Sequence, residues 1–594
     1  MNIAPWWEAH PGRLEYELAR LDDADVHYRV DERLKAAGIL RLELTVGAEG
    51  GRHRQLSATF PDTYPYTRPE VSAPAEALLH HQNPFSKALC LLGRSTEAWT
   101  TTDTLAWLIR TQLPLALAAG QATAPAGPAA ADLDEERQAE PVSDYYPYVQ
   151  SSMILIDGAW DVPPAVASGG LEIGFSAKPV VPPNEHFDQR LLAAVLTVRD
   201  DDGTAIVEAD TRLGRLFAEP MAGRWSRLPA PVISDDPKVV WEAAVAADPG
   251  MAGRLGRPGR STQMEIRAVL FPEEVAWRAS GTGWLFVVRE FGAFSKVSKK
   301  QSSRGRTAPR EPDRYWFVRA GRAGPDDLAA RVPELRSLPG KAAAVYGIGA
   351  LGSQVIDQLA RAGVGSLRVL DCDHVDPGTM ARHAAGFESW GVSKLLAACF
   401  LTQRRSPYVE TFLSHVRIGA PRTDPSVPSD IALIAESLDG VELLIDATAE
   451  IGLQDLLAGI ARARGIGYLS LWGTNGGWGG MAVLIRPDSE ACWVCFLHHL
   501  TDGTIPVPPE APSPFVQPPG CASPTFTGSG FDMDEVSLQA VRMAAGYLSD
   551  SVAGGYPSYT QDIARLALRT PDGTVTLPTW TGYQLTRHAA CPEH

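Results

Sequence analysis

Residues 341–394 read KAAAVYGIGALGSQVIDQLARAGVGSLRVLDCDHVDPGTMARHAAGFESWGVSK. The stretch begins with an apolar run, passes through a glycine turn and a helical pattern from about Ala350, and reaches a second apolar run ending in Asp371. This order predicts a strand, a turn, a helix and a parallel strand, as in a Rossmann-like α/β fold. The helix would point its positive N-terminal end at the turn, where a phosphate can bind.

The glycines of this turn predict a nucleotide site. Gly347, Gly349 and Gly352 carry no side chain, so the backbone can approach a phosphate closely. Asp371 follows about twenty residues later, where a carboxylate can hydrogen-bond a ribose hydroxyl. These features alone would suit a dinucleotide-dependent oxidoreductase as well as an ATP-binding protein.

Charged residues beyond the turn favour ATP. Arg382 and Lys394 follow the second strand, and Asp446 closes another apolar run, VELLIDATAE. Two cations match the charge of a triphosphate, and a carboxylate can hold the magnesium ion that accompanies it. We therefore expect Arg382 and Lys394 at the phosphates, Asp446 at Mg²⁺ and Asp371 at the ribose.

The composition is that of an ordinary globular protein. The chain has 594 residues, 45% of them hydrophobic and 21% charged, and its net charge is −16. This acidic balance argues against non-specific nucleic-acid binding, which needs a basic surface. No apolar run approaches the length that spans a bilayer, and MNIAPWWEAHPGR is no signal peptide, so we expect a cytoplasmic protein without membrane contact. In that compartment the seven cysteines are expected to be metal ligands, nucleophiles or buried residues rather than disulfides.

Changes of pattern along the chain predict three domains and a linker in an α/β multidomain protein. The strand-like runs ILRLELTV and HRQLSATF precede a helical run, TDTLAWLIRTQLPLAL, and an Ala/Pro/Gly-rich segment then indicates a flexible linker. The runs SSMILIDG, LLAAVLTV, GWLFVVREF and DRYWFVRA predict a strand-rich middle domain, to which the sequence assigns no role. The expected boundaries are 1–118 (α+β), 119–142 (linker), 143–325 (strand-rich) and 326–594 (Rossmann-like).

The C-terminal motifs resemble those of the ThiF-like adenylating domain of ubiquitin-activating enzymes. The shared elements are GIGALGS, the D-x-D-x-V run ending at Val375, Arg382, the GVSK around Lys394, and the DAT at Asp446. Bacterial enzymes that adenylate sulfur carriers share this pattern. Thr379 and His383 depart from it, because the family usually has Asn and often has Gln at these positions. The resemblance implies that ATP converts the C-terminal carboxylate of a partner protein to an acyl-adenylate, and that the domain forms a homodimer.

The N-terminal segment resembles the ubiquitin-conjugating fold. YPYTRPEV at residues 64–71 precedes HHQNPFSKALCLL, and Trp99 follows. The resemblance implies that Cys90 carries a thioester and that Asn83 donates to the oxyanion formed when an amine attacks. The turn reads His-Gln-Asn-Pro rather than His-Pro-Asn, which puts Asn83 one residue closer to the cysteine than is usual. The alternative is a buried structural cysteine between Leu89 and Leu91.

Two cysteine motifs near the C-terminus predict a zinc site. Cys492 and Cys495 have C-x-x-C spacing, and Cys591 and His594 have C-x-x-H spacing. Together they can supply one closed, tetrahedral Cys₃His site. In the related activating enzymes the second pair is usually C-x-x-C, so His594 would be a substituted ligand, and His588 competes with it. The alternative is a redox role for the first pair.

Cys521 lies in a Pro/Gly-rich segment before a helix predicted to start near Asp532. A cysteine on a loop can travel between an acyl-adenylate and solvent. Its position resembles that of the cysteine with which activating enzymes take the acyl group from AMP; an incidental loop cysteine is the alternative. Cys372 and Cys399 fall at a strand end and in a helical run, so we expect them to be core residues.

The whole arrangement resembles bacterial fusion enzymes of anti-phage operons, including those of cyclic-oligonucleotide-based anti-phage signalling (CBASS). One branch joins the C-terminal glycine of a cGAS-like nucleotidyltransferase to lysines of other proteins, which primes the synthase; a second branch handles bacterial ubiquitin-like modifiers. The resemblance favours the first branch. It implies ATP, Mg²⁺ and Zn²⁺ as cofactors and a relay from Cys521 to Cys90. The alternatives are a sulfur-carrier adenylating enzyme with a non-catalytic N-terminal domain, and a scaffold without activity.

Overall fold

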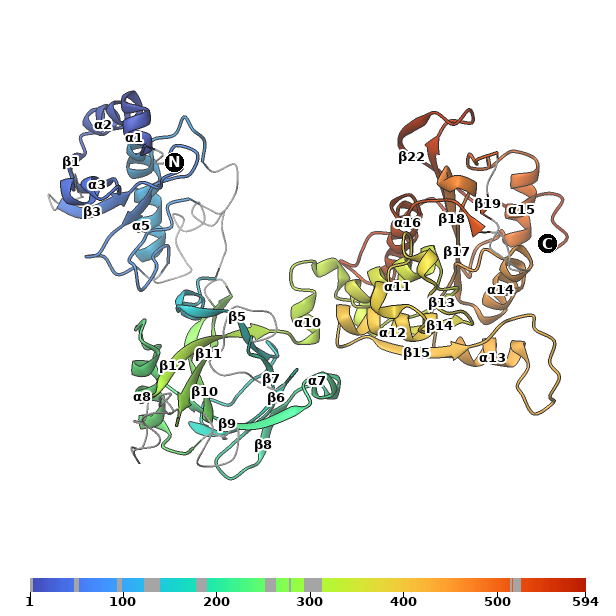
Figure 1. Ribbon diagram of the computed structural model, residues 1–594, viewed down its shortest axis with the longest axis horizontal. Helices are drawn as coiled ribbons and strands as arrows, with labels where there is room; N and C mark the ends of the chain where they lie inside the picture. The colour runs from blue at the N-terminus through green and yellow to red at the C-terminus, as the bar shows by residue number, and fades with distance from the viewer. Residues whose placement is uncertain are drawn as a thin grey trace, which may run out of the picture. The chain divides into compact units, whose positions relative to one another are not determined.

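The computed structural model falls into two compact units, shown in Figure 1. The first comprises Met1–Ile156, Trp160–Asp210 and Phe217–Gly321, and the second comprises Asp157–Ala159, Thr211–Leu216 and Arg322–His594. The structure describes residues 4–47, 53–78, 80–92, 99–121, 139–177, 190–251, 263–276, 279–292, 312–512, 515–516 and 525–593.

The N-terminal part of the first unit is a four-stranded antiparallel sheet covered by helices. The sheet runs in the order β1 (His27–Val30), β2 (Arg41–Gly47), β3 (His53–Thr59) and β4 (Glu70–Ser72). The two predicted strand-like runs form β2 and β3, because their alternate residues face one core; Leu42, Leu44, Leu56 and Ala58 are all buried. The helices are α1 (Trp6–Ala9), α2 (Pro11–Asp23), α3 (Glu32–Ala36), α4 (Leu105–Trp107), the π-helical η1 (Leu108–Gln112) and α5 (Leu113–Gln121).

The remainder of the first unit is an eight-stranded sheet that closes on itself. The short 3₁₀ helix η2 (Val142–Tyr145) leads into it, and α8 (Pro237–Ala247) packs on its outside. The order is β5-β12-β11-β10-β9-β6-β7-β8, and an additional β5–β7 pairing completes the closure. Its strands are β5 (Tyr148–Ile156), β6 (Ser168–Phe175), β7 (Leu192–Arg199), β8 (Ala205–Glu208), β9 (Glu219–Arg227), β10 (Gln263–Ala276), β11 (Ala279–Phe291) and β12 (Arg314–Arg322).

The second unit is a three-layer α/β/α domain of the Rossmann type. Its sheet order is β15-β14-β13-β16-β17-β18-β21-β22, with the first five strands parallel. These are β13 (Ala342–Tyr346), β14 (Ser366–Asp371), β15 (Glu410–His415), β16 (Leu443–Asp446) and β17 (Gly467–Gly473). The antiparallel strands are β18 (Gly479–Ile485), β21 (Ile563–Arg569) and β22 (Val575–Tyr583).

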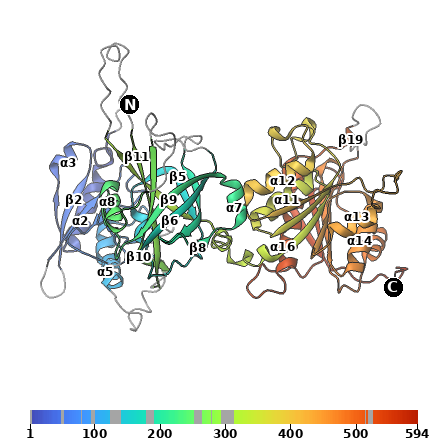
Figure 2. The same cartoon turned by 90° about the horizontal axis from the view of Figure 1, so that it is seen from below.

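Helices cover both faces of this sheet, as Figure 2 shows. Helices α11 (Ala350–Ala362), α12 (Lys394–Arg405) and α16 (Gly530–Ser549) pack on one face, and α13 (Asp430–Ser437), α14 (Ile451–Arg464) and α15 (Trp493–Thr501) pack on the other. Successive β13 residues alternate between the two cores, which is why this strand is apolar throughout. The strand order reverses beside β13, and ligands of such sheets bind at the carboxyl ends of the strands there.

Among the described residues, no helix combines the length and the apolar character needed to cross a bilayer.

Candidate active sites

The glycine turn after β13 has the geometry of a phosphate-binding turn. Gly347 has a φ of +82°, which favours glycine. A Cβ on Gly352 would lie 1.9 Å from the Gly347 carbonyl oxygen, so α11 packs directly on the turn. Gly349 caps the N-terminus of α11, and nothing lies within 4 Å of where its Cβ would be. The turn is therefore closed on the helix side and open at the position where a phosphate would approach.

Asp371, at the end of β14, holds the turn in place. Its Oδ2 accepts a hydrogen bond from the Ile348 amide at 2.6 Å, and its Oδ1 accepts one from the Asp373 amide at 2.7 Å. The side chain is almost fully buried, at 8% exposure. The carboxylate predicted to bind ribose thus also positions the turn, and its role toward a ribose stays a prediction.

Lys394 is paired with a carboxylate that the sequence analysis did not single out. Its Nζ lies 3.0 Å from Oδ2 of Asp373, and its amide donates to the Asp373 carbonyl at 2.9 Å. Although desolvation works in the opposite direction, the hydrogen bond and charge of Lys394 hold the pKa of Asp373 below its ordinary value. The D-x-D motif could have indicated this pair, because its second aspartate, Asp373, is the acidic partner of Lys394.

Arg382 and His383 follow on the segment that packs against the turn. Burial lowers the pKa of both side chains. His383 Nε2 donates to the Ile348 carbonyl at 3.1 Å, and its Nδ1 accepts from the Ala385 amide at 3.0 Å, so the imidazole is held neutral. His383 therefore binds the backbone carbonyl of Ile348, and Asp371 binds the backbone amide of the same residue.

Asp446 is completely buried at the end of β16. Its Oδ1 accepts from the Thr448 amide at 3.0 Å and from the Thr448 hydroxyl at 2.7 Å, and its Oδ2 accepts from the Tyr468 hydroxyl at 2.8 Å. Burial raises the pKa of this carboxyl. Glu450, four positions on, is an exposed carboxylate at the same end of the sheet. Magnesium ligation by Asp446 would have to share or replace these hydrogen bonds, and it stays a prediction.

Cys90 lies on a small hairpin of the first unit, residues 80–92, which we call the Cys90 loop. Gln82 and Leu89 face each other across it, and the Cys90 amide donates to the His81 carbonyl at 2.8 Å. Leu89 and Leu91 are buried, whereas Cys90 is exposed. Alternation along an extended segment explains this pattern, and it excludes the interpretation of Cys90 as a buried structural cysteine.

Asn83 shapes the tip of the Cys90 loop. Its Oδ1 accepts hydrogen bonds from the Phe85 amide at 2.8 Å and the Ser86 amide at 3.0 Å. Its backbone adds bonds to Lys87 and Ala88. The side-chain oxygen therefore caps the turn, and the Nδ2 group is the atom that the predicted oxyanion role requires.

Three cysteines of the second unit converge. Cys492 Sγ lies 3.8 Å from Cys495 Sγ and 3.6 Å from Cys591 Sγ, and all three residues are buried. Thiols at this separation match the donor set of a zinc site. His588 faces elsewhere, because its Nε2 contacts Asp502 at 3.0 Å and its Nδ1 accepts from the Ala590 amide at 3.0 Å.

Two predicted site residues, Cys521 and His594, lie outside the described residues. The short strands β19 (Phe515–Val516) and β20 (Thr525–Phe526) flank Cys521 in sequence and pair antiparallel. After them, the Gly530 amide at the start of α16 donates to the Ala381 carbonyl at 3.1 Å, next to Arg382. The helix predicted near Asp532 thus begins at Gly530.

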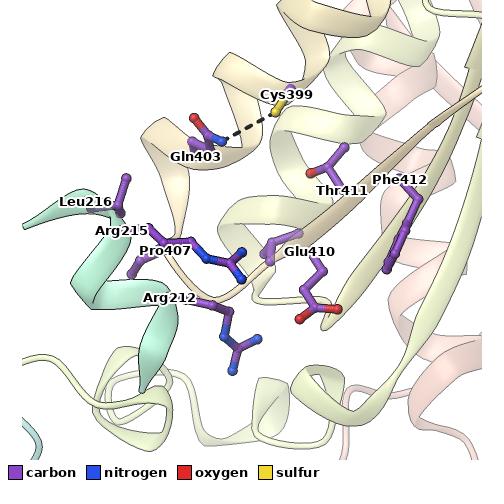
Figure 3. Close-up of a pocket in the computed structure, with 10 residues that line it drawn as sticks. Arg212, Arg215, Leu216, Cys399, Gln403, Pro407, Glu410, Thr411 and Phe412 are labelled. Atoms are coloured by element: carbon purple, nitrogen blue, oxygen red, sulfur yellow. Dashed lines mark hydrogen bonds between the residues drawn. The ribbon is translucent and has the colours of Figure 1, made fainter. Parts of the chain in front are cut away.

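The prediction that Cys372 and Cys399 are core residues is wrong, since both are half-buried. Cys372 stands just past the end of β14, and Cys399 lines a separate pocket of about 390 Å³ in the second unit. In Figure 3 this pocket lies between α7 (Thr211–Leu216), α12 and β15, and its lining includes Arg212, Arg215 and Glu410. Glu410 is the first residue of β15, so the pocket is at the amino end of the parallel strands, opposite the glycine turn.

Comparisons with known proteins match a family model to the region of each candidate site. The Prokaryotic E2 family B model matches residues 24–154, and the ThiF family model matches residues 329–538. The chain is 32% identical over 581 residues to the uncharacterized protein y4qC of Sinorhizobium fredii (strain NBRC 101917 / NGR234), covering 95% of this chain and 93% of that protein. The uncharacterized protein y4oA of the same strain is 28% identical over 608 residues, covering 99% and 97%.

The name of a third relative describes an enzymatic activity. The ATP-dependent ubiquitin transferase-like protein Cap2 of Pseudomonas aeruginosa (strain BWHPSA011 / Pa011) is 31% identical over 176 residues, which is 29% of this chain and 30% of that protein. The match to y4qC over most of both chains establishes the family, and the ThiF match together with the similarity to Cap2 supports the enzyme class. The chain belongs to the same family as y4qC, joins a prokaryotic E2 domain to a ThiF domain, and is an ATP-dependent transferase of the ubiquitin-activating and ubiquitin-conjugating type.

Proposed function

We propose that this enzyme activates the C-terminal glycine of a partner protein with ATP and transfers it, through two thioesters, to a lysine of a target protein. One observation carries the proposal: a single chain holds both a nucleotide-binding turn and an exposed thiol on an E2-type loop. A nucleotide site alone would serve many single-step reactions, and a thiol alone would have no activated acyl group to accept.

The proposed first step is attack of the glycine carboxylate on the α-phosphate of ATP, which forms acyl-AMP and releases pyrophosphate. Both reactants are anionic, so cations beside the phosphates lower the barrier, and we assign this task to Arg382 and Lys394. We assign the ribose to Asp371. The open space at Gly349 supports placing the phosphates beside the glycine turn, because it lies at the positive N-terminal end of α11.

Three acyl transfers follow in the proposal. The Cys521 thiolate attacks the acyl-adenylate, forms a thioester and expels AMP. The Cys90 thiolate then takes the acyl group from Cys521 by thioester exchange. A lysine amine finally attacks the Cys90 thioester, forms an amide and returns the thiol, with Asn83 Nδ2 proposed to donate to the oxyanion.

Described residues that flank Cys521 in sequence support the second step. Its flanking strands β19 and β20 pair with each other, and the chain after them contacts Ala381, beside the proposed phosphate ligand Arg382. Gly530, the first residue of α16, therefore lies beside the segment that carries Arg382. Free thiols are required throughout, which suits a reducing compartment such as the cytoplasm.

For the metals, we propose Mg²⁺ with the ATP and Zn²⁺ at the cysteine trio. Asp446 is the proposed magnesium ligand, with Asp373 as the more accessible competitor, since its side chain is 66% exposed. Asp446→Asn and Asp373→Asn distinguish them: loss at the true ligand is partly overcome by raising the magnesium concentration. Zinc would be held by Cys492, Cys495 and Cys591, with His594 proposed as the fourth ligand because both nitrogens of His588 are engaged.

The zinc proposal has its own measurement. Metal analysis of the full chain should find one zinc per protomer, and Cys591→Ser should lose it, whereas the matched variant Cys372→Ser should keep it. Equal zinc content in both variants would refute the assignment. The redox alternative predicts a Cys492–Cys495 disulfide that forms in oxidant while metal is absent.

A cGAS-like nucleotidyltransferase of anti-phage defence is the proposed glycine-tailed partner, and a bacterial ubiquitin-like modifier is the second candidate. The partial similarity to a ubiquitin transferase-like protein supports a protein substrate in either case. We also propose that the enzyme acts as a homodimer, through its ThiF domain. A pull-down with each candidate partner, followed by ATP–pyrophosphate exchange, separates the two.

Trapping of thiol conjugates tests the relay. With ATP, Mg²⁺ and partner, the parent enzyme should form two reductant-sensitive adducts, Cys90→Ala should form one on Cys521, and Cys521→Ala should form none. Cys399→Ala is the matched control and should behave like the parent. Unchanged products in Cys90→Ala would favour a sulfur-carrier enzyme, NAD binding without exchange would favour an oxidoreductase, and no exchange with any partner would favour a scaffold.

A further inference from the structure

The Cys90 loop contacts the closed sheet of the same unit through two histidine–glutamate pairs. His80 Nε2 lies 3.0 Å from Oε2 of Glu274, which stands on β10. The His81 amide donates to Oε2 of Glu140 at 2.8 Å, and its Nδ1 lies 3.6 Å from the other oxygen of that carboxylate. Both histidines belong to the loop, so the contacts reach the hairpin that bears the thiol rather than the helices behind it.

The two pairs are joined into one chain of contacts. The Glu140 amide donates to Oε2 of Glu274 at 2.9 Å, the same oxygen that contacts His80. Glu140 holds the His81 amide, and the His81 carbonyl accepts from the Cys90 amide. Glu274 is therefore connected to the backbone of the proposed nucleophile through two intervening residues.

Apolar and polar contacts beside this chain fix the segment that carries Glu140. The Phe85 and Tyr146 rings are 5.1 Å apart, and Tyr146 meets Phe317 of β12 at 5.0 Å. Ser143 donates through its amide and its hydroxyl to Glu273, each at 2.9 Å. The loop tip and the segment after the linker thus rest on one patch of the sheet.

The paired side chains are shielded from water. Exposure is 11% for His80, 16% for Glu274, 21% for His81 and 17% for Glu140. Hydrogen bonds to a charged group are stronger when water is excluded, and a buried carboxylate that loses its partners is destabilised. Removing one carboxylate should consequently be felt along the whole chain of contacts.

We propose that the closed sheet is part of the acyl-transfer site, and that Glu274 and Glu140 are positioning residues that hold the Cys90 loop in its working shape. This inference rests on the proposed function, since it assumes that Cys90 carries the acyl group. It gives the middle domain a task that its own strands do not reveal. The sheet supplies a rigid platform that holds the loop with its thiol exposed for acyl transfer.

The test uses the full chain without partner or ATP, so that it is independent of the relay. Amide hydrogen exchange in residues 80–92 should rise about tenfold in Glu274→Ala, because the hydrogen bonds from His80 and from the Glu140 amide to that carboxylate disappear. Glu274→Gln, which keeps a carbonyl acceptor, should restore most of the protection. Glu219→Ala, a matched change at an exposed position of β9, should leave the loop as in the parent.

Two further measurements separate positioning from general stability. The rate at which N-ethylmaleimide labels Cys90 should rise at least about threefold in Glu274→Ala, since a loosened loop releases Sγ from the Leu92 carbonyl at 3.6 Å, while labelling of Cys372 stays constant. The double variant His80→Ala/Glu274→Ala should exchange no faster than Glu274→Ala alone. Parent-like exchange and labelling in Glu274→Ala would overturn the inference. If exchange and labelling change as expected but no acyl adduct is ever found on Cys90, the proposed function is overturned instead.

Discussion

The glycine turn of the second unit and the Cys90 loop of the first are held in different ways. Ile348, in the turn, is gripped by Asp371 and His383, which are 23 and 35 positions away in sequence. The Cys90 loop is held by Glu140, 59 positions from His81, and by Glu274, 194 positions from His80. The first is assembled from one continuous stretch of chain, and the second depends on another domain.

This difference separates two kinds of site. A turn built from neighbouring residues is complete wherever its motif occurs, so its chemistry can be recognised by spacing. A loop held by distant carboxylates has a shape that its own residues do not specify. The turn should therefore be most sensitive to mutations within its own stretch of sequence. The Cys90 loop should also be sensitive to mutations of the distant carboxylates that contact it.

The largest expected effect is at the nucleotide turn. Lys394→Ala should lower ATP–pyrophosphate exchange about 10²–10³-fold, because a cation that stabilises developing phosphate charge is lost. Lys341→Ala is the matched control: Lys341 also pairs with a carboxylate, Glu442, at 2.8 Å, but at the amino end of β13. Equal losses in the two variants would show that the positive charge of Lys394 has no special role in the reaction.

The second effect concerns the Cys90 loop and separates two tasks of Asn83. Asn83→Asp keeps the oxygen that accepts from Phe85 and Ser86 but removes the Nδ2 donor. Amide formation from the Cys90 thioester should fall about 10²-fold, with amide exchange of the loop unchanged. Asn83→Ala loses both tasks and should also loosen the loop. Parent-like transfer by Asn83→Asp would remove Asn83 from the mechanism.

The third effect tests how tightly the turn packs. Gly352→Ala should destabilise the second unit by about 2 kcal/mol in urea unfolding, because the added methyl meets the Gly347 carbonyl oxygen. Gly349→Ala should leave stability near that of the parent, since its Cβ enters open space, yet weaken ATP binding in calorimetry. If Gly349→Ala binds ATP normally, the phosphate does not approach there.

The smallest effect is a pH dependence of the turn. Burial lowers the pKa of His383 below its ordinary value of 6.5, so the opened turn binds more protons than the closed one between those two values. Stability contributed by neutral His383 is therefore complete above pH 6.5 and falls as the pH drops toward the lowered pKa. His383→Gln can keep both hydrogen bonds but does not titrate. Protection of Ile348 from amide exchange, compared at the same pH, should differ between parent and variant at pH 5 and not at pH 7.5; equal protection at pH 5 would contradict the prediction.

Much of the second unit could be predicted from its spacing. The glycine turn, the helix from Ala350 and the strand ending at Asp446 lie where their patterns placed them, because each depends on contacts within a short stretch. The pairing of Asp373 with Lys394 was missed, since the spacing assigned a task only to the first aspartate. The burial of Cys372 and Cys399 was misjudged, because an apolar neighbourhood in sequence does not reveal which side of a helix or which end of a strand meets solvent.

The sequence by itself identified a glycine turn, spaced cations and paired thiols by their spacing, and a conjugating-type cysteine by its resemblance to a known family. Tertiary structure alone revealed that Asp371 and His383 both bind Ile348 and that Glu274 contacts the Cys90 loop. The physical reason is separation along the chain. Contacts between residues a few turns apart are dictated by backbone periodicity, whereas contacts across up to 194 positions arise only when whole sheets have packed.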